Sequence, residues 1–140
     1  MKKLLSITLL ALIAFTIPFA FIGCKSTSSK VIGTWTLKEN RQLDDKGALI
    51  STTPTRKDYI CTICFKKNKT VIYSDKIVGD QSFSNTIEGT WKQTSNNTIE
   101  ASMTRYDDDN NSWINKWIFK IENNELVYYK QKNDLFIFIK

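Results

Sequence analysis

From residue 31 onward the chain alternates between short runs containing apolar residues and clusters of polar residues. In most runs the apolar residues recur at every second position, which is the period of a β-strand with one buried face. The clusters between the runs are rich in Asn, Asp, Lys and Ser, which are typical turn residues. We therefore expect strands at about residues 31–39, 48–52, 58–65, 70–75, 86–93, 98–103, 113–121, 125–131 and 135–140.

Eight or nine short strands with hairpin-sized turns predict an all-β fold built as one antiparallel meander. Such a sheet has exposed edges unless it closes on itself. We therefore expect an antiparallel up-and-down barrel over residues 31–140, and periodicity leaves a two-sheet sandwich open as the alternative. Outside the first 23 residues, no segment has the 3.6-residue apolar stripe of a helix.

The alternation also predicts which side chains point into the barrel. Trp35 and Leu37 share one face of the first strand. The last two strands contain "LVYYK" and "LFIFI", which are apolar on both faces, so they are either covered on both sides or expose an apolar patch. The other inward sets are Ile87, Gly89 and Trp91; Ile99, Ala101 and Met103; and Trp117, Phe119 and Ile121.

The first 23 residues have the layout of a secretory signal peptide, because two lysines precede an apolar segment, 4–22. The segment is also close to the length of a membrane-spanning helix. The sequence "FIGC" at 21–24 resembles a bacterial lipobox, although Phe21 stands where an aliphatic residue is usual. The resemblance implies that residues 1–23 are removed and that Cys24 carries palmitate-type acyl chains. An uncleaved anchor helix is the alternative, and both predict attachment to a membrane.

The residues after Cys24 indicate where such a lipoprotein resides. Residues 24–30, "CKSTSSK", predict a lipidated Cys followed by a short, flexible, polar tether. Lys25 occupies the position where an acidic residue resembles inner-membrane retention signals, so the outer membrane is favoured. The tether lacks the acidic cluster of some surface-exported lipoproteins. We therefore expect the periplasmic face of the outer membrane in a bacterial cell envelope.

Composition restricts the chemistry of the chain. It has 140 residues, no histidine and a formal charge of +6, which falls to +4 if residues 1–23, with Lys2 and Lys3, are removed. The basic residues are spread along the chain, which argues against a nucleic-acid partner. Without histidine the usual general base and the commonest metal ligand are missing. We expect a non-enzymatic protein without a cofactor or metal. A carboxylate-dependent enzyme is the alternative, but Glu88 and Glu100 fall on polar faces.

Cys61 and Cys64 have the C-x-x-C spacing but lie in a predicted strand. Positions three apart in a strand point to opposite faces and are about 10 Å apart, beyond the roughly 7 Å limit for a disulfide. We expect one buried thiol and one on the other face. A local disulfide is the alternative in an oxidising compartment, whereas a zinc site would need further Cys or His ligands.

The acidic stretch "DDDNN" at 107–111 suggests calcium because it offers oxygen ligands at alternate positions. A calcium loop needs Gly at its sixth position and Glu at its twelfth. Ser112 and Ile118 stand at these positions. We therefore expect a solvated hairpin loop.

Four segments in order, "VIGTWTLKEN", "FKKNKT", "GTWKQTSNNTIE" and "IENNELVYY", resemble the small lipocalin-like, calycin-type domains of bacterial lipoproteins over about residues 31–131. The resemblance implies a barrel whose Gly-x-Trp segments close it, with Gly33, Trp35, Gly89 and Trp91 as the closing residues. A glycine in such a strand marks a place where a backbone or a ring comes too close for a side chain.

Two positions depart from that family. Lys69 follows Asn68 where the family usually has Gly, which disfavours a two-residue turn with positive φ at both positions. Larger lipocalins stack a late-strand Arg on the first Trp. No arginine occupies such a position here, so Trp35 must be capped by a Lys or simply packed.

The resulting functional expectation is a lipid-anchored lipocalin-like barrel whose interior can hold a small hydrophobic or amphipathic ligand. A barrel of eight strands is just wide enough either to be filled by side chains or to hold one such molecule. The alternative is a filled barrel that acts as an envelope protein–protein interaction module, with an unknown partner, through its surface or an apolar edge at 135–139. The expected cavity-wall residues are Leu37, Phe65, Tyr73, Met103, Phe119 and Tyr128.

Overall fold

A computed structural model describes residues 28–106 and 109–140. The predicted signal peptide, residues 1–23, and the predicted lipidation site, Cys24, lie outside the described residues. No helix in the described part is long and apolar enough to cross a membrane. The elements are α2 (Ser28–Val31), β1 (Gly33–Leu43), β2 (Leu49–Pro54), β3 (Tyr59–Phe65), β4 (Thr70–Ile77), β5 (Asp80–Gln93), β6 (Thr98–Tyr106), β7 (Ser112–Glu122), β8 (Glu125–Tyr129) and β9 (Asp134–Ile139).

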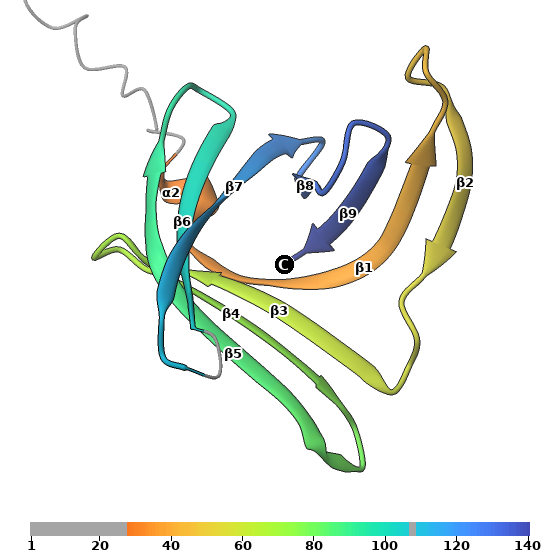
Figure 1. The fold of residues 1–140 in the computed structure, drawn as a ribbon. Helices are drawn as coiled ribbons and strands as arrows, with labels where there is room; N and C mark the ends of the chain where they lie inside the picture. The colour runs from red at the N-terminus through yellow and green to blue at the C-terminus, as the bar shows by residue number, and fades with distance from the viewer. Residues whose placement is uncertain (1–27, 107–108) are drawn as a thin grey trace, which may run out of the picture.

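The strands form one antiparallel sheet, and β9 pairs with β1 (Figure 1). This pairing closes eight strands, β1 and β3 through β9, into a barrel. The ninth strand, β2, pairs with the second half of β1. The prediction of an antiparallel up-and-down barrel of eight or nine strands is confirmed. The largest error in the strand bounds is at β5, which begins at Asp80 instead of residue 86. Residues 80–85 are all exposed, so they carry no buried alternation that could have revealed the strand.

The two ends of the barrel differ. We call the end formed by α2 and the turns β3–β4, β5–β6 and β7–β8 the closed end. The opposite end, with the hairpins β1–β2, β4–β5, β6–β7 and β8–β9, is the open end. Figure 1 shows the β1–β2 and β4–β5 hairpins projecting away from the body of the barrel. Residues 28–30, the end of the predicted tether, belong to α2, and the next residue, Val31, is fully buried.

The main hydrophobic core fills the closed half of the barrel. The inward faces predicted for the first, fifth and sixth strands are buried as expected. Phe65 contacts Trp91 and Phe119 edge to face, with 5.6 Å between ring centroids in each pair. The largest fully buried side chains are Phe65, Phe119, Ile63, Ile99, Met103, Leu126, Ile137, Val31 and Val71.

The two last strands are covered on both faces, which settles the alternatives for their apolar pattern. Val127, Leu135 and Ile137 form a second buried cluster on the outer face. Arg41 of β1 donates to both carboxylate oxygens of Glu125 of β8, at 2.9 and 3.1 Å. Because β9 lies between β1 and β8, this ion pair crosses β9 on the outside.

An irregularity in β1 reverses its inward face. Leu37 is paired with Phe138 and points inward, whereas Glu39 is paired with Ile137 and points outward. The extra residue between them, Lys38, shifts the alternation by one position. In the second half of β1, side chains that strict alternation would assign to the surface therefore point into the barrel.

Cys61 and Cys64 lie on opposite faces of β3. Cys61 is buried inside the barrel and Cys64 is half-buried on the outer face. Both are free thiols. The prediction of two separated thiols is confirmed.

Candidate functional site

Trp35 closes the barrel beneath α2. Its indole N–H donates to the carbonyl of Val31 at 2.8 Å, and its side chain is 3% exposed. The ammonium of Lys140 lies 4.9 Å from the ring centroid, a cation–π distance. The same ammonium donates to the carbonyls of Lys30 and Ile32 at 2.7 and 3.0 Å. Lys140 is therefore the Lys cap that the sequence left open, and it fastens the start of the domain to its last strand.

Trp91 closes the same end beside the β3–β4 turn. Its indole N–H donates to the carbonyl of Lys66 at 3.0 Å, and the Lys69 ammonium lies 4.0 Å from its ring centroid. Lys69 has φ of +69°, and its N–H donates to the Lys66 carbonyl, while Asn68 accepts from the N–H of Thr70. Lys69 is the one residue of this turn with positive φ, so the turn is not the two-residue type with positive φ at both positions that the sequence disfavoured. The Lys69 side chain makes a cation–π contact with Trp91 that a glycine at this position could not make.

The two glycines predicted to help closure, Gly33 and Gly89, are needed for different structural reasons. Gly33 has φ of +127°, in the region that favours glycine. Gly89 lies where β5 crosses close to β6, and any side-chain carbon there would collide with the backbone carbonyl of Ser102. Gly89 therefore sets the close approach of these two strands.

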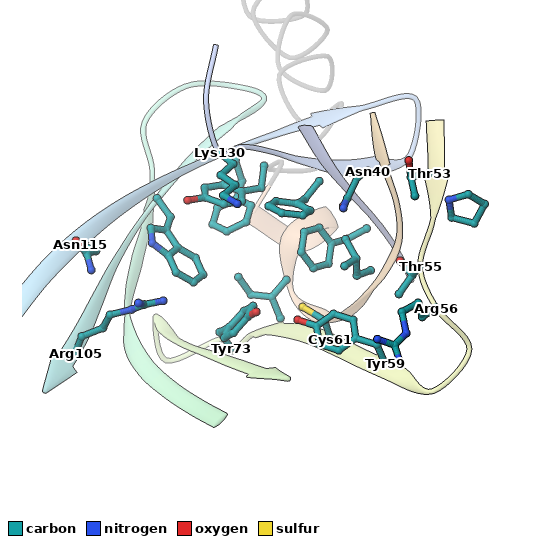
Figure 2. Close-up of a pocket in the computed structure, with 18 residues that line it drawn as sticks. Asn40, Thr53, Thr55, Arg56, Tyr59, Cys61, Tyr73, Arg105, Asn115 and Lys130 are labelled. Atoms are coloured by element: carbon teal, nitrogen blue, oxygen red, sulfur yellow. The ribbon is translucent and has the colours of Figure 1, made fainter. Parts of the chain in front are cut away.

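The open half of the barrel contains a cavity of about 620 Å³ (Figure 2). This volume lies within the range of about 300–1,000 Å³ that is typical of small-molecule sites. Its wall is drawn from most of the barrel strands, from β2 and from the links that follow β2 and β8. The lining residues are Leu37, Asn40, Thr53, Pro54, Thr55, Arg56, Tyr59, Cys61, Ile63, Tyr73, Arg105, Asn115, Trp117, Phe119, Tyr128, Lys130, Phe136 and Phe138.

Four of the six residues expected in a cavity wall line this cavity: Leu37, Tyr73, Phe119 and Tyr128. Phe65 and Met103 also point inward, but both are fully buried and do not line it. Phe65 is the closed-end residue of β3, and Met103 is enclosed where it pairs with Gly89. Alternation predicts the inward direction of a side chain but not its height along the barrel axis, which explains both differences.

Aromatic rings form the apolar wall of the cavity. The Trp117 ring centroid lies 5.2 Å from that of Tyr73, edge to face, and 5.3 Å from that of Tyr128. Tyr128 in turn lies 5.2 Å from Phe119 and stacks with Phe136 at 6.1 Å. Since each ring is held by its neighbours, this wall is preorganised for an apolar group.

The wall between β3 and β4 carries polar groups that are uncharged at neutral pH. Burial raises the pKa of Tyr59 to about 12, and burial also raises the pKa of Tyr73 and of the Cys61 thiol. The Tyr59 hydroxyl donates to one carboxylate oxygen of Asp75 at 2.9 Å. The other oxygen of Asp75 is buried and has no hydrogen-bond partner among the described residues. A raised thiol pKa makes Cys61 a poor nucleophile.

Sequence reasoning missed the polar part of the cavity. Arg105, Asn115 and Lys130 line it toward the open end, with Asn40 and Thr53 on the side of β1 and β2. Arg105, Asn115 and Lys130 each lie two positions from an inward-facing apolar residue, so extending the alternation could have found them. The described residues contain no group of three or more Cys, Asp or Glu placed to hold a metal ion.

Comparisons with known proteins give no family assignment. No family model matches the chain, and no curated protein matches it. A solved structure that resembles it is that of an uncharacterized protein from Bacteroides eggerthii. The two are 12% identical, the match covers 79% of this chain and 98% of that chain, and the TM-score is 0.49. A function for this chain must therefore be argued from its own sequence and from the geometry of the barrel.

Proposed function

We propose that this protein is a lipid-anchored, lipocalin-like lipoprotein of the bacterial cell envelope that binds a small hydrophobic or amphipathic molecule in its open-end cavity. The observation that carries the proposal is the cavity of about 620 Å³ with its wall of interlocked aromatic rings. Such a concave, mostly apolar site with a few polar groups is the usual form of a small-molecule site.

The distribution of side chains favours ligand binding over the filled-barrel alternative. Large side chains fill the closed half, where Phe65 and Met103 are fully buried. The open half instead contains the cavity, which Trp117, Tyr128 and Phe136 help to line. A barrel that served only as a surface for another protein would have no need of this hollow half.

A binding role rather than catalysis is supported by the chemistry of the wall. The chain has no histidine. The cavity lining, all of which belongs to the described residues, includes no Asp or Glu. Its hydroxyl and thiol groups on β3 and β4 have raised pKa values and remain protonated at neutral pH. The wall thus offers contact and hydrogen bonding rather than a general base.

Anchoring through Cys24 would orient the barrel. Cys24 precedes the first residue of α2, Ser28, by four positions, and four residues span at most about 14 Å. Since α2 lies at the closed end, a lipid on Cys24 would hold the closed end near the membrane. The mouth of the cavity would then face away from that membrane.

A matched pair of substitutions on β3 tests the binding site. Cys61→Phe adds a ring inside the cavity, whereas Cys64→Phe adds the same ring to the outer face. The uncharged fluorescent probe N-phenyl-1-naphthylamine should bind the wild type and the Cys64 variant and bind the Cys61 variant at least tenfold more weakly. Native mass spectrometry of the purified domain would show a co-purifying molecule. Equal probe binding by all three proteins, or no binding by the wild type, would contradict the proposed site.

The anchor needs its own experiment in a bacterial host. An alkyne analogue of palmitate should label the wild type, and the labelled protein should fractionate with the outer membrane. The Cys24→Ala variant should lose the label, whereas Cys64→Ala should keep it. Labelling that persists without Cys24 would reject the lipobox interpretation and leave the cavity proposal untouched.

A further inference from the structure

Charge is distributed unevenly around the cavity. Three of its lining residues, Arg56, Arg105 and Lys130, are cationic, and within the described part of the chain no lining residue is acidic. All three are exposed, but Arg56 is already paired with Asp58, at 2.5 Å. The positive charge that remains at the cavity therefore belongs to Arg105 and Lys130.

Arg105 reaches the cavity from β6. It continues the inward face of that strand, and its guanidinium carbon lies 6.0 Å from the centroid of the Trp117 ring. Figure 2 shows its side chain extending toward the middle of the cavity. Burial raises the pKa of the Tyr128 hydroxyl on β8, and the charge of Arg105 opposes that rise. The charge of Arg105 therefore acts on Tyr128, which also lines the cavity.

Lys130 approaches from the other side of β7, directly after the end of β8. Its ammonium lies 5.4 Å from the ring centroid of Phe136, and its backbone N–H donates to the Asp134 carbonyl at 3.1 Å in the β8–β9 turn. In Figure 2 the side chain lies at the upper edge of the cavity, across from Arg105. One cation from β6 and one from the β8–β9 turn therefore flank an aromatic surface.

On the β3–β4 side of the cavity, the charge of Asp75 contributes, after burial, to the raised pKa values of Tyr59 and Cys61. Asp75 accepts a hydrogen bond from Tyr59 and does not line the cavity. A ligand that occupies the cavity would meet the uncharged hydroxyl and thiol groups of Tyr59, Tyr73 and Cys61 on that side. Its only charged contacts within the described residues would be cationic.

We infer that the ligand is an amphiphile with an anionic oxygen head group, either a carboxylate or a phosphate monoester. Its apolar tail would lie among Phe119, Phe136 and the neighbouring rings, and its head would bind Arg105 and Lys130. A guanidinium can donate two parallel hydrogen bonds to a carboxylate or phosphate, and the flexible ammonium adds a third charge-assisted bond. This inference rests on the proposed function, because it assigns a ligand class to the same cavity.

Four decyl compounds that differ only in the head group test the inference by displacement of N-phenyl-1-naphthylamine. Decanoate and decyl phosphate should bind at least about tenfold more tightly than decan-1-ol, because a charge-assisted hydrogen bond contributes more than a neutral one. Decyltrimethylammonium should bind most weakly. Raising the salt concentration should weaken decanoate binding and leave decan-1-ol unchanged.

Two double variants locate the selectivity. Arg105→Gln with Lys130→Gln should lose the preference for the anionic compounds while still binding decan-1-ol. Lys92→Gln with Lys116→Gln removes the same amount of charge from exposed positions on the outer face. This variant should keep the preference for the anionic compounds. Arg105→Lys, which retains the charge, should keep part of the preference. Urea midpoints of all variants establish that each protein is folded.

The outcomes separate this inference from the proposed function. If no decyl compound displaces the probe, or the probe itself does not bind, the proposed function fails. If all four bind equally, or the cationic compound binds best, the cavity is a binding site but the anionic ligand class is wrong. Selectivity that survives in the Arg105/Lys130 double variant also overturns the assignment. Selectivity for only decanoate or only decyl phosphate supports it and identifies the head group.

Discussion

The closed and open halves of the barrel both contain large inward-facing aromatic residues, but these residues pack differently in the two halves. At the closed end Trp35, Phe65 and Trp91 are buried, and both indole N–H groups donate to backbone carbonyls. At the open end Trp117 and Phe136 stay partly exposed around a cavity. The comparison indicates that the closed half provides most of the stability, whereas the open half can leave space for a ligand.

The largest expected effect comes from truncating one aromatic residue in each half. Phe65→Ala should destabilise the protein by about 3–5 kcal/mol, because it opens a cavity in a filled core. Phe136→Ala removes a ring that is only partly buried and borders the cavity, so it should cost clearly less and instead weaken ligand binding. Urea unfolding measures the first effect and probe titration the second. Equal losses of stability would break the comparison between the two halves.

Glycine substitutions sharpen the comparison at the level of the backbone. Gly89→Ala should cost about 2–3 kcal/mol, since the added carbon meets the backbone of Ser102 and the strands must separate. Gly79 lies in the β4–β5 hairpin of the open end, where an added Cβ would meet no other atom. In Gly79→Ala the only source of strain is the backbone φ of +87°. This substitution should cost about 1 kcal/mol. The two values come from thermal or urea unfolding, and a reversed order would mean that the β5–β6 crossing is not rigid.

Removing the charge that seals the closed end should have a smaller effect. Lys140→Met keeps much of the side-chain volume but loses the two hydrogen bonds to the carbonyls of Lys30 and Ile32 and the cation above Trp35. We expect a loss of about 1 kcal/mol and a change in tryptophan fluorescence. Lys92→Met, at an exposed outer position, is the matched control. No difference between the two variants would show that Trp35 needs only packing.

The smallest effect concerns the ion pair outside the barrel. The hydrogen bond from Arg41 holds the pKa of Glu125 below its ordinary value of about 4.5. Since the folded-state pKa is the lower one, the stabilisation is present above about pH 4.5 and is lost as the pH falls through the folded-state value. Wild type should exceed Glu125→Gln in stability by less than about 1 kcal/mol at pH 7. Urea midpoints from pH 7 to 3 should show that difference shrinking, and a constant difference would contradict this account.

The sequence predicted the closed half better than the open half for a physical reason. Where one face of a strand is buried, as with Ile99, Ala101 and Met103 of β6, apolar residues recur at every second position and the strand can be recognised in the sequence. Toward the mouth the inward positions carry Arg105 and Asn115, which look like surface residues, so the apolar period ends before the strand does. Alternation alone cannot reveal the shift at Lys38, which brings Asn40 to the cavity, because it arises from strand pairing.

The pairing of β1 with β9 has a consequence for how the chain acquires its shape. Ribosomes make β1 before every other barrel strand and β9 after all of them, so the first strand waits with an open edge until the final segment has emerged. Contacts between such distant segments slow folding and expose unpaired strands meanwhile. The barrel can close only after β9, its last strand, has been synthesised. This order is compatible with passage of an unfolded chain through a membrane before the barrel forms.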